Sequence, residues 1–205
     1  MGDALDPFLG LVEILRLAYS GELAAARAYR GHWRSLRSPA LRDRIRQIED
    51  EEWHHRRQVG AMLETLGRKP SLVRELRAEI VGRVLGTLCH VVGWLPPMYG
   101  AGRLESRNIV EYETAARYAE RAGHGELTDC LLTMAEVEWE HEAFFRAQVM
   151  SHRRAGRLSI WPAPAPKEEI RASFSREFQQ GSVECPSPTG WIMQRASSLP
   201  PGTAS

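Results

Sequence analysis

"EDEEWHHRR", residues 49–57, places a glutamate three residues before a histidine, and so does "EVEWEHEAFF", residues 136–145. Residues three or four positions apart lie on the same face of an α-helix, so each stretch predicts a helix that presents a carboxylate beside an imidazole. One Glu-x-x-His pair is common on a solvated helix face. Two pairs in separate helical stretches of a single 205-residue chain indicate a shared site.

Apolar residues at helical spacing predict which of these side chains are buried. In the first stretch the row is Leu41, Ile45, Ile48, Glu52, His55, Val59, Met62 and Leu66. The neighbouring pair, Glu51 and His54, shares its helix face with Arg44, Gln47 and Gln58, so we expect that pair to be solvated. In the second stretch the row is Leu127, Leu131, Met134, Glu138, His141 and Phe145.

Two further glutamates interrupt apolar rows in the same way. Glu22 lies in a row with Leu11, Leu15, Ala18, Ala25 and Tyr29. Glu105 lies in a row with Met98, Gly102, Ile109, Tyr112 and Ala116, whereas Glu111 occupies an alternative row with Leu104, Ala115 and Tyr118. The pattern favours Glu105 over Glu111 and leaves the choice open.

The whole chain is predicted to be all-α. Asp6-Pro7 and Ser38-Pro39 each place a capping residue before a proline at the first helical position. We expect helices over residues 7–35, 39–66, 72–94, 98–122 and 126–152, which make a four-helix bundle with an extra connecting helix. Residues 1–158 would form this bundle, and residues 159–205 a Pro/Ser/Gly-rich, largely irregular C-terminal tail.

Composition limits the function. A net charge of +1 gives no reason to expect a nucleic-acid partner. The three cysteines form no CxxC pair, which argues against a disulfide framework, a zinc ribbon and a rubredoxin site. We expect a cytoplasmic protein, with peripheral contact at the inner face of the membrane as the alternative. The apolar segment 84–102 is either a buried connecting helix or the surface that makes this contact and admits an apolar substrate.

Four buried carboxylates would repel one another unless cations lay among them. Two divalent metal ions would balance their charge, and carboxylate oxygen with imidazole nitrogen suits iron or manganese. A zinc hydrolase is disfavoured because His-Glu-x-x-His is absent. We therefore expect two metal ions at this site, of either iron (Fe2+/Fe3+) or manganese. The predicted ligands are Glu22, Glu52, His55, Glu105, Glu138 and His141.

Four stretches resemble the demethoxyubiquinone hydroxylase family of the ferritin-like di-iron superfamily: "GELAAARAYRG", "EWHHRRQVGAML", "ESRNIVEY" and "EWEHEAFF". The resemblance covers about residues 10–150. It implies that Glu22, Glu52 and His55 bind one iron and that Glu105, Glu138 and His141 bind the other, with Glu52 and Glu138 able to bridge. Tyr112 matches a tyrosine of that family and is the candidate catalytic residue. The family tends to have histidine just before this tyrosine, where this chain has Glu111.

This resemblance implies a di-iron monooxygenase that uses O2 to hydroxylate an apolar aromatic substrate similar to a ubiquinone precursor. The alternative is a ferritin-like or rubrerythrin-like ferroxidase or peroxide-scavenging protein. A third hypothesis is a binding scaffold with a relic site that holds no metal. A homo-oligomer is compatible with each of these.

Overall fold

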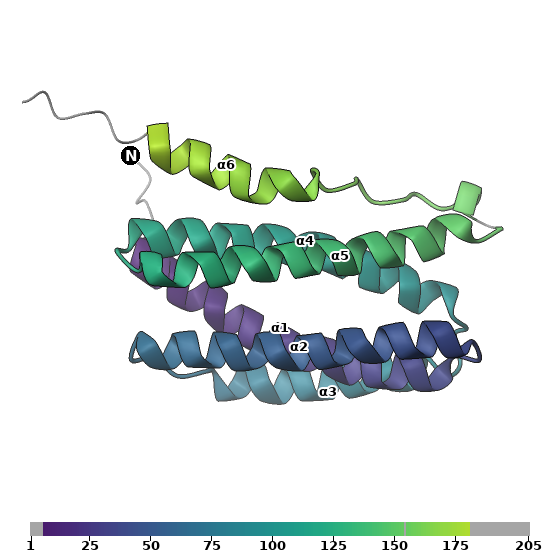
Figure 1. Ribbon diagram of the computed structural model, residues 1–205. Helices are drawn as coiled ribbons and strands as arrows, with labels where there is room; N and C mark the ends of the chain where they lie inside the picture. The colour runs from purple at the N-terminus through teal and green to yellow at the C-terminus, as the bar shows by residue number, and fades with distance from the viewer. Residues whose placement is uncertain (1–5, 154, 181–205) are drawn as a thin grey trace, which may run out of the picture. The chain divides into compact units, whose positions relative to one another are not determined.

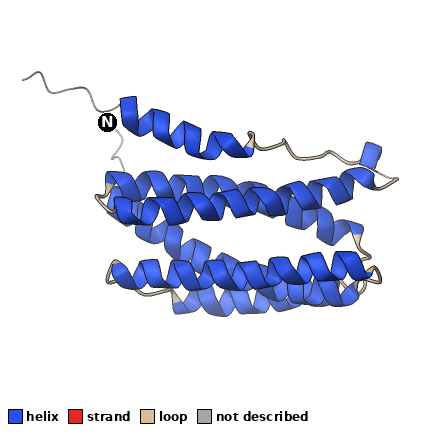
Figure 2. Ribbon diagram, in the orientation of Figure 1, coloured by secondary structure: helices blue, strands red, loops and turns tan. Residues whose placement is uncertain are grey.

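The computed structural model describes residues 6–153 and 155–180, and every regular element in these ranges is helical (Figures 1 and 2). The prediction of an all-α, ferritin-like helical bundle is therefore confirmed. The α-helices are α1 (Pro7–Ser35), α2 (Pro39–Thr65), α3 (Leu72–Leu88), α4 (Leu95–Arg121), α5 (Thr128–Ser151) and α6 (Lys167–Gln180). Two short 3-10 turns, Gly125–Leu127 and Ala155–Arg157, lie on either side of α5.

The bundle is built from two helical hairpins, α1 with α2 and α4 with α5 (Figure 1). Helix α1 also packs against α4, and α3 packs along α1. Apolar side chains of α1, α2, α4 and α5 fill the interior, where the rings of Tyr29 and Phe145 stack with their centroids 5.6 Å apart. Each fully buried large apolar side chain contributes about 1.5–3 kcal/mol to the stability of such a core.

Local sequence signals account for most helix ends. The Asp6 carboxylate accepts a hydrogen bond from the Phe8 N–H at 2.9 Å, ahead of Pro7 at the first helical position. Gly67 and Gly123 follow α2 and α4 with φ angles of +65° and +78°, a left-handed conformation that terminates helices and that glycine adopts without strain.

The boundary between the third and fourth helices differs from the prediction. Helix α3 ends at Leu88 rather than residue 94, and α4 begins at Leu95 rather than residue 98. Pro96 and Pro97 occupy the first turn of α4, where the N–H groups that proline lacks have no partner within the helix. Proline therefore starts a helix here instead of ending one, and segment 84–102 is two helix ends joined by a loop.

The C-terminal region contains a helix that the prediction of an irregular tail did not include. Residues 167–180 contain no proline, and Glu168 and Glu169 in the first turn of α6 complement the helix dipole. Residues 181–205 lie outside the described ranges, and the division of the chain at residue 158 stays a prediction. The described part of the chain divides into two units, with the boundary after Arg171. In the second, the rings of Phe174 and Phe178 lie 4.6 Å apart.

The segment before α6 is held by α5. Trp161 is buried, and its indole N–H donates to the Glu142 carboxylate at 2.7 Å. Arg146 donates to the same carboxylate and to the Trp161 carbonyl oxygen. These bonds give the buried Glu142 both a cationic and a neutral donor, so its charge is compensated within the fold.

Helices α1 and α3 meet so closely that their backbones touch at glycine. A Cβ atom added to Gly31 would lie 2.2 Å from the Gly86 carbonyl oxygen, and one added to Gly82 would lie 2.5 Å from the Ala24 carbonyl oxygen. Both distances are far below van der Waals contact, and backbone atoms cannot rotate aside as a side chain can. The contact between α1 and α3 therefore requires glycine at these positions.

We predict that Gly31→Ala lowers the free energy of unfolding by about 1–3 kcal/mol, because the added methyl group forces α3 away from α1. Gly100→Ala is the matched control, since a Cβ at Gly100 in α4 meets nothing within 4 Å. It should leave stability unchanged or raise it slightly. Urea unfolding followed by circular dichroism measures the stability of both variants. Equal effects of the two substitutions would contradict the requirement for glycine at the contact between α1 and α3.

A buried histidine makes the fold sensitive to acid. His32 is 2% exposed, its Nε2 atom has no hydrogen-bond partner, and burial lowers its pKa to about 4. The unfolded chain binds this proton near pH 6.5, whereas the folded chain binds it only near pH 4. The corresponding stability is thus present above about pH 6.5 and is lost as the pH falls from there towards 4.

We predict that His32→Leu removes up to about 3 kcal/mol of the stability that the natural protein loses between about pH 7.5 and pH 4.5. Urea unfolding at both pH values measures the difference. Other titrating groups are common to the two proteins and cancel in the comparison. An unchanged pH dependence in the variant would show that the pKa of His32 is the same in the folded and unfolded chains, and would contradict this prediction.

Candidate metal centre

All six side chains predicted to bind metal meet in the interior between the two hairpins. Their exposed fractions lie between 0% and 3%. Helices α1 and α4 contribute one glutamate each, and α2 and α5 contribute one Glu-x-x-His pair each: Glu22, Glu52, His55, Glu105, Glu138 and His141. The apolar rows place them there, because burying each row against its neighbours brings the interrupting polar residue inward as well.

The cluster divides into two overlapping groups of atoms that could hold metal ions. One contains Glu22, His55 and Glu138, and the other contains Glu52, Glu105, Glu138 and His141. Within each group the candidate ligand atoms lie within 4.8 Å of one another. Glu138 belongs to both groups, and its oxygens lie 2.9 Å from His55 Nδ1 and 3.5 Å from His141 Nδ1. Of the alternatives on the fourth helix, Glu105 lies in the cluster and Glu111 does not.

The cluster lacks the partners that buried polar atoms normally have. In the described ranges seven buried side-chain nitrogen or oxygen atoms have no hydrogen-bond partner, and five of them belong to the cluster. These five are Glu22 Oε2, both carboxylate oxygens of Glu52, Glu138 Oε2 and His141 Nδ1. An unpaired buried polar atom costs about 1–3 kcal/mol. Oxygen and nitrogen atoms left open in this arrangement fit divalent metal ions.

Burial and mutual repulsion disturb the protonation of the carboxylates. Burial raises the pKa of Glu22, Glu52 and Glu105, and the charges of neighbouring carboxylates raise those of Glu52 and Glu105 further. Burial would also raise the pKa of Glu138, but its contacts with the imidazoles of His141 and His55 outweigh burial and hold the pKa low. Protons and imidazolium charges thus supply the compensation that metal ions would otherwise provide.

Two buried tyrosines support the glutamates that come from α1 and α4. The Tyr112 hydroxyl donates to Glu22, and the Tyr29 hydroxyl donates to Glu105. Both hydroxyls stay protonated, because burial and the nearby carboxylates raise their pKa values well above the usual range. The Tyr112 ring also lies edge-on to His55, with ring centroids 5.9 Å apart.

Glu51 contradicts the prediction that it is a solvated residue outside the site. Its carboxylate lies 2.6 Å from His141 Nε2 and also accepts hydrogen bonds from Arg44 and Gln47. Glu51 thus orients the imidazole so that Nδ1 faces the cluster, whereas His54 is exposed as predicted. The α2 sequence alone could not reveal this, because the partner of Glu51 comes from α5. The sequence signal for this role was that Glu51 directly precedes Glu52, which places a second carboxylate next to a predicted ligand.

A cavity of about 290 Å³ reaches the cluster between α1 and α4. Glu22 and Tyr112 form its inner wall, and Leu17, Ala18 and Leu104 are among its apolar lining residues. Glu111 also lines it, and burial together with the charges of Glu22 and Glu138 raises the pKa of Glu111 to about 7. A small apolar molecule could therefore approach the cluster along this cavity.

The fold and the site together define a class: a ferritin-like helical bundle whose buried carboxylates and imidazoles are able to hold metal. Residues 10–107 match the family described as "Ubiquinone biosynthesis protein COQ7". The predicted resemblance to the demethoxyubiquinone hydroxylase family is thereby confirmed. The matched residues include Glu22, Glu52, His55 and Glu105, and they end before Glu138 and His141.

Neither the curated proteins nor the solved structures gave a match to this chain. None of the helices in the described ranges is both long and apolar enough to cross a membrane.

We predict that Glu51→Gln weakens metal binding about 10–100-fold, because the uncharged amide holds the His141 imidazole less firmly and lowers its basicity. Glu64→Gln is the matched control, since Glu64 is exposed on the same helix. Anaerobic titration with Fe(II) or Mn(II), followed by calorimetry, measures both affinities. Equal affinities of the two variants would contradict a role for Glu51 in positioning His141.

Proposed function

We propose that this protein is a di-iron monooxygenase that hydroxylates an apolar aromatic substrate similar to a ubiquinone precursor. The observation that carries the proposal is the set of buried carboxylate and imidazole atoms that face one another without partners. The match to a ubiquinone biosynthesis family supports the substrate class. The family match is the basis for preferring iron, since manganese accepts the same oxygen and nitrogen donors.

Glu22, His55 and Glu138 would hold one iron ion, and Glu52, Glu105 and His141 would hold the other together with Glu138. Bound iron would supply the redox chemistry that activates O2. The chain keeps the ligands fixed through Tyr112 on Glu22, Tyr29 on Glu105 and Glu51 on His141. The complete burial of the inner ligands excludes bulk water, which would otherwise compete for reactive species.

The cavity between α1 and α4 offers a path for the substrate. Leu17 and Leu104 provide apolar contact, while Arg107, Asn108 and Glu111 could orient the oxygen atoms of an aromatic ring. Tyr112 lies where this cavity meets Glu22, so its hydroxyl would face both the substrate and a ligand carboxylate. None of the lining residues belongs to segment 84–102, so this cavity does not provide entry beside that segment.

We also propose that the apolar face of α3 rests on a membrane, from which such a substrate would be drawn. Exposed apolar side chains run from Leu72 to Val92, including Val73 at 80% and Val91 at 78% exposed. This surface begins well before residue 84, and the later residues Met98, Ala101 and Gly102 of the predicted segment are buried. A helix with one apolar exposed face suits the interface rather than the interior of a bilayer.

The proposal is tested by loading the protein with Fe(II) without oxygen, then adding a short-chain demethoxyubiquinone, a reductant and O2. Mass spectrometry should detect a product that has gained one oxygen atom. Rapid Fe(II) oxidation without any product would favour the ferroxidase alternative. A purified protein that takes up no iron would favour the scaffold.

Two variants separate the metal site from the cavity. Glu138→Gln should abolish both iron binding and product formation, because Glu138 belongs to both groups of ligands. Leu104→Arg should leave iron content unchanged and lower kcat/KM about tenfold or more, because it places a charge in the cavity. Val110→Arg on the exposed face of the same helix is the control. Equal activity of the two arginine variants would exclude this cavity as the path.

A further inference from the structure

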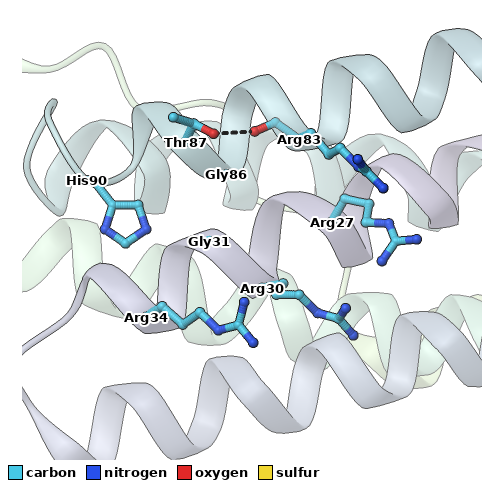
Figure 3. Close-up of a pocket in the computed structure, with 8 residues that line it drawn as sticks. All are labelled: Arg27, Arg30, Gly31, Arg34, Arg83, Gly86, Thr87 and His90. Carbon is cyan, nitrogen blue, oxygen red and sulfur yellow. Dashed lines mark hydrogen bonds between the residues drawn. The ribbon is translucent and has the colours of Figure 1, made fainter.

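A second hollow, of about 430 Å³, lies between α1 and the C-terminal part of α3 (Figure 3). Arg27, Arg30 and Arg34 line it from α1, and Arg83 lines it from α3. Figure 3 shows these side chains around the hollow, with His90, which follows α3, at one end. None of the lining residues belongs to the metal cluster or to the cavity beside it.

Positive charge exceeds negative charge around this hollow. Arg27 and Arg83 share a single carboxylate, that of Glu79, at distances of 2.9 Å and 2.6 Å. Arg30 pairs with Glu49 at 2.7 Å. Arg34 pairs with no carboxylate in the part of the chain that the structure describes, although its guanidinium lies over the Trp33 ring. Four guanidinium groups therefore face two carboxylates, an excess of two positive charges.

The arginines also keep donors for a ligand. The hydrogen bonds of Arg27, Arg30 and Arg83 to carboxylates each use the Nε atom. A guanidinium has five N–H donors, so its terminal amino groups remain able to bind a further acceptor. Thr87 contributes no such donor, because its hydroxyl donates to the Arg83 carbonyl oxygen, as Figure 3 shows.

The glycine contact between α1 and α3 builds the hollow. Gly31 and Gly86 both line it, and their close approach brings Arg83 within reach of the three arginines of α1. The contact between α1 and α3 at these glycines thus sets the positions of the arginines that surround the hollow.

We propose that this hollow binds the phosphate group of an organic phosphate or diphosphate. Planar guanidinium groups bind phosphate oxygens in pairs, and several converging on one space suit a group with more than one negative charge. The hollow is open to solvent, so the rest of a larger molecule could extend from a phosphate group bound there. A phospholipid headgroup and a soluble phosphorylated compound present the same chemistry.

The test uses sodium diphosphate as the soluble probe and phosphatidylcholine vesicles, with and without phosphatidylglycerol, as the lipid probe. Arg34→Gln combined with Arg83→Gln removes two positively charged guanidinium groups, and Glu79 keeps its partner Arg27. Arg57→Gln combined with Arg103→Gln removes the same charge from exposed positions elsewhere. Calorimetry measures diphosphate binding by the full chain, and vesicle flotation measures lipid binding. Circular dichroism checks that both variants fold.

We expect the full chain to bind diphosphate, with a Kd raised about tenfold or more in the hollow variant and little changed in the control. Binding to vesicles only when phosphatidylglycerol is present, lost in the hollow variant, would assign the ligand to the membrane. Binding of diphosphate without vesicle binding would assign it to a soluble compound. If neither probe binds, or if both variants lose binding equally, the proposal is wrong. Because iron is not needed, this outcome is independent of the proposed hydroxylase activity.

Discussion

Four carboxylates buried without water must be compensated, and this requirement governs the interior of the bundle. In the structure His55 and His141 compensate Glu138, while burial raises the pKa values of Glu22, Glu52 and Glu105 and so favours their neutral forms. This arrangement is electrostatically tolerable but leaves five inward-facing atoms without partners. The same atoms that weaken the metal-free core are those that metal ions would satisfy. Metal ions bound by these side chains would therefore stabilise the fold as well.

Supports around the cluster come from several helices, and each restrains a different ligand. Tyr112 on α4 holds a glutamate of α1, and Tyr29 on α1 holds a glutamate of α4. Glu51 on α2 holds a histidine of α5. Because each bond crosses between helices, the ligands are positioned by the packing of the bundle as a whole. The family match covers nearly all of the first hairpin, α3 and the first part of α4, whereas α5 completes the cluster beyond it.

The apolar periodicity of each helix predicted which of its residues are buried. It did not predict contacts that depend on a residue from another helix. The apolar rows placed Glu22, Glu105 and the two Glu-x-x-His pairs inside, because the buried face of a helix can be predicted from its own sequence. Glu51 was assigned to solvent because its imidazole partner lies on α5. The arginine hollow was not predicted, since it forms only when Gly31 meets Gly86. The helix start at Leu95 differs from the predicted start at residue 98 because Pro96 and Pro97, residues that commonly end helices, occupy the first turn of α4.

Helix α1 spans 29 residues without a break and serves two sites at once. Glu22 and Tyr29 point into the metal cluster, whereas Arg27, Arg30 and Arg34 line the hollow beside α3. A continuous helix transmits rotation along its axis, because its hydrogen bonds resist local twisting. The two sets of residues therefore share one helix, so a displacement of α1 as a whole would move the Glu22 carboxylate together with the arginines.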